Sequence, residues 1–314
     1  LTFKTSCLSL EKRGFCLRRR VFKFGKQNKV WYNNTAEFWH KLTIELQEEH
    51  MNIIVCVKQV PDTTQIRLDP ETHTLIRDGV ENILNPYDAE ALETALILKD
   101  KYGAAVTVIS MGPPQAKDIL KNAIALGADQ AYLLSDRVFA GSDTLPTSLA
   151  LAELTKSLGE FDLILCGREA ADGCTAQVGP EMAEHLGIPQ VTSAMKVEFE
   201  NGKFIVERET ENWSETVAVP APLLVTMTRA EKELRFASIR GKMKARKMEI
   251  PVKSGADVGL DATKVGLKAS PTRVIKVFTP PVQKVETQII KEDDPDVAVS
   301  QLVEKLIACG AIKR

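Results

Sequence analysis

Short apolar runs alternate along the chain with segments in which apolar residues recur at helical spacing. Runs such as Asn52–Val57 and Ala105–Ile109 are rich in β-branched residues and predict buried strands. Segments such as Gln115–Leu126 and Thr144–Leu158 predict helices, and a glycine follows each of them. Further strands are expected over 130–134, 162–166 and 223–226, and further helices from Pro86 onward and over 177–186. Strands that are apolar on both faces and alternate with helices predict an α/β fold with a parallel sheet that helices cover on both sides.

Two hairpins interrupt this alternation. Residues 66–69 and 74–77 read as a small hairpin around Pro70, and residues 195–199 and 204–209 alternate in polarity around Asn201-Gly202, a strong turn signal. From Met227 the chain is basic, then rich in Gly, Pro and Lys, and helical spacing returns over 297–307. We therefore predict one α/β domain over 51–251 and an extended C-terminal arm over 252–314. An arm of this kind usually becomes ordered by wrapping a partner.

The first 50 residues differ from the rest in charge. They carry 10 Lys and Arg against 5 Asp and Glu, whereas residues 51–314 carry 31 against 37. Their order of basic, apolar and acidic residues fits neither a secretory signal nor a transit peptide. Codons for Gln47–His50 can contain a bacterial ribosome-binding sequence just before the codon of Met51. We expect residues 1–50 to be upstream leader read in frame, with a genuine disordered extension as the alternative.

Composition excludes several classes of protein. Hydrophobic residues make up 44%, charged residues 26%, and the net charge is -1, so neither nucleic-acid binding nor membrane insertion is expected. The domain holds His73 and His185 as its histidines, and its cysteines lack metal or redox spacing, so no metal site is expected. GxGxxG and GxxxxGK[ST] motifs are absent from the sequence. Free cysteines without an export signal, together with the ribosome-binding reading, indicate a bacterial cytoplasmic protein.

Three strand ends could still hold a ligand, because ligands of open α/β sheets lie outside the carboxyl ends of the strands. They are residues 56–58, 110–114 and 166–180. The last is the richest: Gly167 lets backbone approach closely, Gly173 allows a positive φ, and small residues leave amides open at a helix N-terminus, where phosphate binds well. The alternative is an ordinary strand-to-helix loop.

At these residues the chain resembles the β subunits of electron transfer flavoproteins, over essentially all of 51–314. The matching pieces are Val57–Asp62, Arg77–Val80, Asn85–Asp88, Met111–Pro114, Gly127–Asp129, Gly167–Pro180, Arg235–Ile239 and Met243–Lys247. The resemblance implies a fold like that of the adenine nucleotide α-hydrolases, with a doubly wound, mostly parallel sheet. It also implies a heterodimer with an α subunit that carries one FAD, and a structural AMP in the β subunit of ordinary members.

The loop Asp172–Pro180 resembles the electron-bifurcating subgroup, whose motif reads DGDTAQVGP. In that subgroup the β subunit binds a second FAD and takes a hydride from NADH. One electron then passes to ferredoxin or flavodoxin, and the other passes through the FAD of the α subunit to an acyl-CoA dehydrogenase. Residues 141–148 and 270–272 also look like the bifurcating type. Cys174 departs from the motif, where Asp is usual, and Pro146 stands where Ala is common.

The resemblance also implies which residues form the sites. The nucleotide pocket would be lined by Cys56, Asn85, Pro86, Tyr87, Asp88, Met111, Gly167, Arg168, Glu169, Ala170, Asp172, Gly173, Cys174, Thr175, Ala176, Gln177 and Val178. Thr144 and Thr147 would reach the second flavin. Residues 227–248, called here the recognition loop, would dock a dehydrogenase, with Leu234 as the candidate anchor and Arg235 beside it. No residue acts as an acid–base catalyst in this reading, because the flavin supplies the chemistry.

Two other classes of protein share such a fold. A universal-stress-type nucleotide-binding protein would lack the recognition loop and the long arm. An enzyme of the ATP pyrophosphatase type needs an SGGxDS-like loop after the first strand, where this chain has Lys58–Asp62. An ordinary AMP-containing electron carrier remains the alternative within the family.

Overall fold

The computed structural model describes residues 51–62, 67–68, 75–76, 81–275 and 287–312. The first 50 residues lie outside this range, so the leader reading stays a prediction. The described residues fall into two units. The larger contains the body of the chain as far as Arg273, and the smaller contains helix α7 (Pro295–Ala308).

A nine-stranded sheet forms the body, in the order β11-β10-β9-β12-β8-β1-β6-β7-β13. Its strands are β1 (Asn52–Cys56), β6 (Ala105–Met111), β7 (Gln130–Leu134), β8 (Leu163–Gly167), β9 (Gln190–Glu200), β10 (Lys203–Glu209), β11 (Ser214–Pro220), β12 (Leu223–Met227) and β13 (Val252–Lys253). Every neighbouring pair from β9 to β13 is parallel, while β10 runs antiparallel to both β9 and β11. The prediction of a mostly parallel sheet is confirmed.

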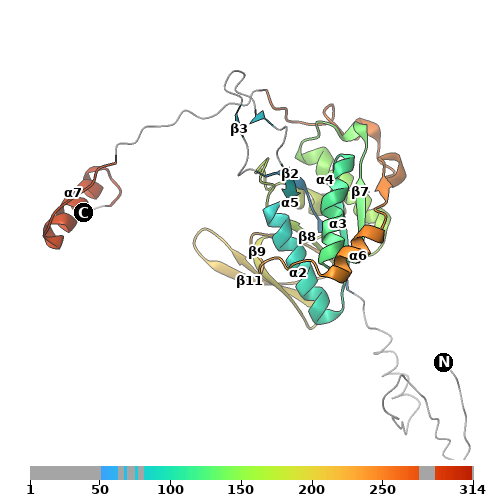
Figure 1. The fold of residues 1–314 in the computed structure, drawn as a ribbon, viewed down its shortest axis with the longest axis horizontal. Helices are drawn as coiled ribbons and strands as arrows, with labels where there is room; N and C mark the ends of the chain where they lie inside the picture. Colours follow the sequence, from blue (N-terminus) through green and yellow to red (C-terminus); the bar gives the residue numbers. More distant parts are fainter. Residues whose placement is uncertain (1–50, 63–66, 69–74, 77–80, 276–286, 313–314) are drawn as a thin grey trace, which may run out of the picture. The chain divides into compact units, whose positions relative to one another are not determined.

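Helices cover both faces of this sheet (Figure 1). α2 (Pro86–Tyr102), α3 (Lys117–Leu126) and α6 (Ile239–Lys247) contribute to one core cluster, and α4 (Thr144–Leu158) and α5 (Val178–Leu186) contribute to the other. Along β1, Ile53 and Val55 belong to the first cluster, whereas Ile54 and Cys56 belong to the second. A strand that is buried on both faces needs apolar residues at every position, which explains its unbroken apolar run.

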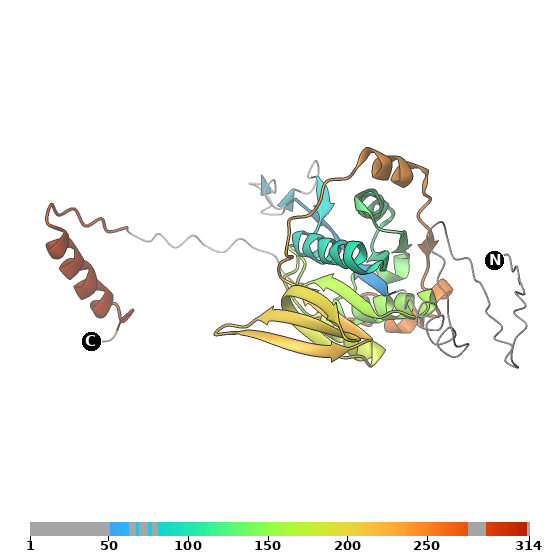
Figure 2. The same cartoon turned by 90° about the horizontal axis from the view of Figure 1, so that it is seen from below.

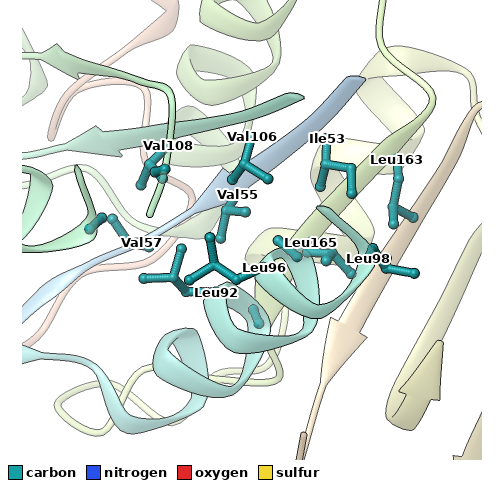
Figure 3. Close-up of a cluster of buried hydrophobic side chains, with 14 of the residues drawn as sticks. Ile53, Val55, Val57, Leu92, Leu96, Leu98, Val106, Val108, Leu163 and Leu165 are labelled. Atoms are coloured by element: carbon teal, nitrogen blue, oxygen red, sulfur yellow. The ribbon is translucent and has the colours of Figure 1, made fainter. Parts of the chain in front are cut away.

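The core beneath α2 shows why this helix is rigidly held. Leu92, Leu96 and Leu98 point at valines and leucines of β1, β6 and β8 (Figure 3). The three leucines are at most 1% exposed. Because α2 crosses the middle of the sheet, its N-terminus reaches the carboxyl ends of these central strands.

The antiparallel edge follows from local turn chemistry. Asn201 and Gly202 have φ values of 50° and 75°, as the expected Asn-Gly turn between β9 and β10 requires. Figure 2 shows β9, β10 and β11 as one ribbon of paired strands. The smaller predicted hairpin is also found, since β3 (Arg67–Leu68) pairs with β4 (Leu75–Ile76). A further pair joins β2 (Gln59–Pro61) to β5 (Asn82–Leu84).

The C-terminal boundary differs from the prediction. β13 pairs with β7, and Val258 and Val265 are buried in the second core cluster, so the compact body continues beyond residue 251, to Arg273. Within the recognition loop, α6 packs against α3. This helix was not predicted, because the apolar residues of the loop show no helical spacing. Of the nine residues of α6, Ala245 alone is buried, so the helix has no periodic stripe of apolar residues in its sequence.

Helix α7 confirms the helix expected over 297–307. Its N-cap Asp294 accepts a hydrogen bond from the amide of Asp296. None of its described residues is buried, and Val299 and Leu302 are 58% and 48% exposed. No helix within the described ranges is long and apolar enough to cross a membrane.

The packing of α2 yields the first prediction. Leu96→Ala should lower the free energy of unfolding by about 2–5 kcal/mol, because it opens a cavity in a fully buried layer. Leu145→Ala on α4 is the matched control; this side chain is 41% exposed and its loss should cost about 0.5 kcal/mol. Denaturant unfolding of the full chain measures both, and equal losses would contradict the packing described for α2.

Candidate functional site

Four parallel strands, β1, β6, β8 and β12, end at one edge of the sheet. The segments after them begin at Val57, Gly112, Arg168 and Thr228. The start of the β8 loop is joined directly to β12, because the amide of Arg168 donates to the carbonyl of Met227 at 2.8 Å. The loops expected to hold a ligand are therefore adjacent, at the edge where ligands of such sheets lie.

Asn85 connects α2 to the β8 loop. It is the N-cap residue of α2, and Pro86 takes the first helical position, where the helix was expected to begin. Its side chain, however, does not cap the helix. Its amide nitrogen donates to the Glu169 carbonyl at 2.8 Å, and its oxygen accepts from the Ala171 amide at 3.0 Å. Asn85 is 1% exposed, so these bonds satisfy a buried amide while they shape the loop.

Asp88 joins two strand ends through one carboxylate. It accepts the amide of Lys58, after β1, at 2.7 Å and the amide of Gly167, the last residue of β8, at 3.0 Å. Asp88 is buried, with 6% of its surface exposed. Burial raises the pKa of Asp88 to about 7, against the opposing effect of Asn85 and of these two amide donors.

Gly167 is required by this close approach. A Cβ at this position would overlap the Asp88 carboxylate and lie 2.7 Å from the backbone carbon of Tyr87. The sequence predicts that Gly167 lets backbone approach closely. The structure shows that the backbone which approaches is the start of α2, against the end of β8. Gly179 has a comparable role, because its Cβ would lie 2.9 Å from the Cys166 sulfur beneath α5.

The loop from Arg168 to Gln177 is open to solvent before α5. Its residues 172–177 are all exposed, and in the part of the chain that the structure describes, the Gln177 side chain makes no cap bond to α5. Free amides at a helix N-terminus, with the helix dipole behind them, suit a phosphate. Lys58 adds a cation, paired with Asp172 at 2.7 Å. Arg168 adds another and lies 5.9 Å from the Tyr87 ring.

The backbone strain in this loop falls on residues other than glycine. Gly173 does not use the positive φ that glycine allows, and the positive values lie at Cys174, at 49°, and Ala176, at 53°. A non-glycine residue pays a conformational cost in this region, and such residues concentrate at functional loops. The amide of Cys174 donates to the Ala170 carbonyl at 2.8 Å, which closes a turn just before the strained residues. Thr175 lies between the two strained residues and Val178 begins α5.

Cys56 and Met111 form part of the floor beneath these loops. Cys56 is 8% exposed and its sulfur lies 3.8 Å from that of Met182 on α5. Burial, and secondarily the charge of Asp88, raise the pKa of the Cys56 thiol above its usual range. Met111 is half-buried against the same core cluster. Both are core residues at strand ends, whether or not they contact a ligand.

Thr144 and Thr147 lie at the start of α4, beside α5. The Thr144 hydroxyl is 3.0 Å from Glu181 Oε1, and the Ser148 hydroxyl is 3.2 Å from Oε2 of the same carboxylate. Glu181 is in the first turn of α5, so it ties the two helix starts together. Asp143, the N-cap of α4, accepts bonds from the amide and hydroxyl of Thr272 at 2.8 Å. The two predicted ligand regions are therefore neighbours.

The candidate residues of the recognition loop contact the body of the chain. Leu234 packs against the main core cluster, and Arg235 forms ion pairs with Glu93 and Asp100 on α2. The exposed large apolar residues of the loop are Phe236 (100%), Ile239 (82%) and Met243 (54%). Sequence reasoning missed them because apolar residues next to a basic run show no periodicity.

A shallow hollow accompanies the exposed residues. It has a volume of about 570 Å³ and is lined by Ile239, Arg240, Met243, Lys244 and Lys247. Its walls combine apolar side chains with cations, which suits an apolar contact on an acidic partner surface. Among the described residues, no group of three His, Cys, Asp or Glu side chains could hold a metal ion.

Comparisons with known proteins agree with this layout. Residues 72–258 match the electron transfer flavoprotein domain family. Electron transfer flavoprotein subunit beta of Megasphaera elsdenii is 49% identical over 266 residues, which cover 82% of this chain and 98% of that protein. Subunit CarD of the caffeyl-CoA reductase-Etf complex of Acetobacterium woodii is 45% identical, covering 82% and 100%. Protein FixA of Azorhizobium caulinodans is 45% identical, covering 73% and 85%.

Replacement of Asp88 by Asn tests the junction at the strand ends. The Asn side chain places an NH2 group where Asp88 has one of its two oxygens, so one of the two backbone amides faces a donor instead of an acceptor. The free energy of unfolding should fall by about 1–3 kcal/mol. Glu153→Gln, which removes an exposed pair with Lys156 on α4, is the control and should cost about 0.5 kcal/mol or less.

The loss of stability in Asp88→Asn should also depend on pH. Because the pKa of Asp88 is raised to about 7 in the folded chain, the group contributes stability that is full below about pH 4 and is lost as the pH rises through 7. Asn cannot titrate, so Asp88→Asn should destabilise the chain more at pH 5 than at pH 8. Denaturant unfolding at the two pH values measures this difference, and an equal loss at both would show that Asp88 is ionised throughout.

Proposed function

Because the chain belongs to the electron transfer flavoprotein family, as a relative of its β subunits, we propose that it pairs with an α subunit and carries electrons by way of bound flavin. The single observation that carries the proposal is a pair of polar side chains at the start of α2. Asn85 hydrogen-bonds the backbone of the open loop before α5, and Asp88 accepts the amides of Lys58 and of Gly167, where that loop begins. Family membership removes the universal-stress and pyrophosphatase alternatives.

The loop geometry fits an adenine nucleotide. The amides that open α5 would hold phosphate groups, and Lys58 and Arg168 would balance their charge. Asn85, Asp88 and Gly167 would act by fixing the loop, since their polar groups are already used within the chain. Thr144 and Thr147 would contact the part of the ligand that lies over the start of α4.

We further propose that the nucleotide in this subunit is FAD and that the complex is electron-bifurcating. The support is the resemblance of Asp172–Pro180 to the bifurcating motif, together with 45% identity to a subunit of a caffeyl-CoA reductase-Etf complex. When bound, this flavin would accept a hydride from NADH and release its electrons singly. The acceptors would be ferredoxin or flavodoxin and, through the FAD of the α subunit, an acyl-CoA dehydrogenase or a related CoA-thioester reductase. Cys174 in place of the usual Asp removes a carboxylate beside the proposed flavin, so an ordinary AMP-containing electron carrier is the second candidate.

The recognition loop would dock the dehydrogenase through its exposed apolar residues. Ile239 and Phe236 would fill apolar pockets, and the cations of α6 would steer an acidic partner. The prediction for Leu234 stays untested, but its core contact argues that Ile239 is the better anchor. The α subunit would cover the exposed apolar side chains of α7, such as Val299 and Leu302.

The content of released cofactors tests the nucleotide proposal. The chain is co-expressed with its α subunit, and FAD and AMP are quantified after denaturation of the purified heterodimer. We expect two FAD per heterodimer and no AMP. One FAD with one AMP would contradict bifurcation and leave the ordinary carrier. A heterodimer with neither nucleotide in this subunit would contradict the site itself.

The docking surface is tested by Ile239→Ala in the same heterodimer. Loss of a central apolar anchor should raise the KM for the cognate dehydrogenase roughly 10-fold to 30-fold, while cofactor content is unchanged. Trp213→Ala is the control, because Trp213 is a 63% exposed apolar residue on the loop before β11. An unchanged KM in the Ile239 variant, or an equal rise in both, would contradict docking through α6.

A further inference from the structure

Helix α2 turns a row of carboxylates toward the recognition loop. Glu90 accepts the amide of Ala230 at 2.7 Å, and Glu93 accepts the amide of Arg235 at 3.0 Å. Asp100 accepts the Arg235 side chain at 2.8 Å. Two points of the loop backbone are thus hydrogen-bonded to acids of one helix, which the core holds against the sheet.

The contact between Glu93 and Arg235 is unusually complete. The Glu93 side chain is 3% exposed, so its negative charge would be costly to bury without the Arg235 cation beside it. Arg235 donates to it from the backbone amide, from Nε at 3.0 and 3.1 Å, and from Nη2 at 2.9 Å. One carboxylate therefore fixes both the backbone and the side chain of the same residue. A lysine could supply the charge but not the planar fork.

A second fixed point lies just beyond the exposed residues. The Ser238 hydroxyl caps α6 by accepting the Gly241 amide at 3.0 Å. Gly241 itself lies so close to α3 that a Cβ would overlap the carbonyl oxygen of Ala125. The Lys244 ammonium donates to the carbonyl of Ala128 at 3.0 Å. Phe236 and Ile239 therefore lie between an anchor at Arg235 and an anchor at Gly241.

We propose that Arg235 and Glu93 are positioning residues for partner docking: their contact holds Phe236 and Ile239 in the conformation that the dehydrogenase binds. The inference rests on the proposed function of the recognition loop and deepens it. A buried ion pair contributes little net stability but defines geometry well. A docking loop that is ordered before binding avoids the entropy cost of ordering it in the complex.

Substitutions in the heterodimer separate positioning from stability. Arg235→Met, with the paired variant Glu93→Gln/Arg235→Met that leaves no buried charge, should raise the KM for the cognate dehydrogenase roughly 5-fold to 10-fold. kcat at saturating dehydrogenase and cofactor content should not change. Arg235→Lys should fall between these variants and the natural chain. Lys101→Met removes the exposed ion pair of the same helix with Glu198 and should have no effect.

Limited trypsin digestion reports on the loop directly. Arg229, Lys232, Arg240 and Lys242 are cleavage sites on either side of the anchor. Cleavage at these sites should become at least about 5-fold faster in Arg235→Met and in the paired variant, since local opening governs the rate. Lys101→Met should be cleaved at the natural rate.

The outcomes distinguish this inference from the function on which it rests. A lower Tm in the Arg235 variants with an unchanged KM and unchanged cleavage would overturn the positioning role. If Ile239→Ala raises the KM but the Arg235 variants do not, the inference fails and the docking function stands. If neither raises it, both fail. Should Arg235→Met not fold, Arg235→Lys decides by the same measurements.

Discussion

The carboxylate of Asp88 is the contact on which the proposed site depends. It accepts one amide from the end of β1 and one from the end of β8, two adjacent strands of the sheet. A buried carboxylate is costly unless donors surround it, and the two amides are donors that would otherwise need partners of their own at the strand ends. Neither group is satisfied without the other. The position of the strand-end loops therefore follows from where α2 lies on the sheet.

This dependence explains why little of α2 faces solvent. One side of it packs into the core through Leu92 and Leu96. Glu90 and Glu93 lie under the recognition loop, and Asn85 and Asp88 under the β8 loop. A helix with partners on most sides loses the simple amphipathic pattern of a surface helix. Its acids are structural, although by sequence alone they look like a solvated face.

The regular fold could be predicted because the sheet is buried on both faces and its helices end at glycines. Thr144–Leu158 and Gln130–Leu134 were predicted with their observed bounds. β13 was missed because a two-residue edge strand carries too little pattern, and α6 because a helix that buries one alanine has no apolar stripe. The site was predictable as a set of strand ends. How the loops are held was not, since the contacts of Asn85, Asp88 and Glu93 join residues about 30 to 140 positions apart.

The glycines of the β8 loop show the same limit. A motif rich in glycine suggests positive φ angles. At Gly167 and Gly179, however, glycine is required because a Cβ would collide with a neighbouring element where a helix approaches the sheet. The left-handed conformations fall on Cys174 and Ala176, which must be held by the structure around them. Two sets of hydrogen bonds supply that support: the turn that the Cys174 amide closes, and the bonds of the Asn85 side chain to the loop backbone. Part of the support for this loop therefore comes from Asn85, at the start of α2, which lies outside the motif by which the loop is recognised.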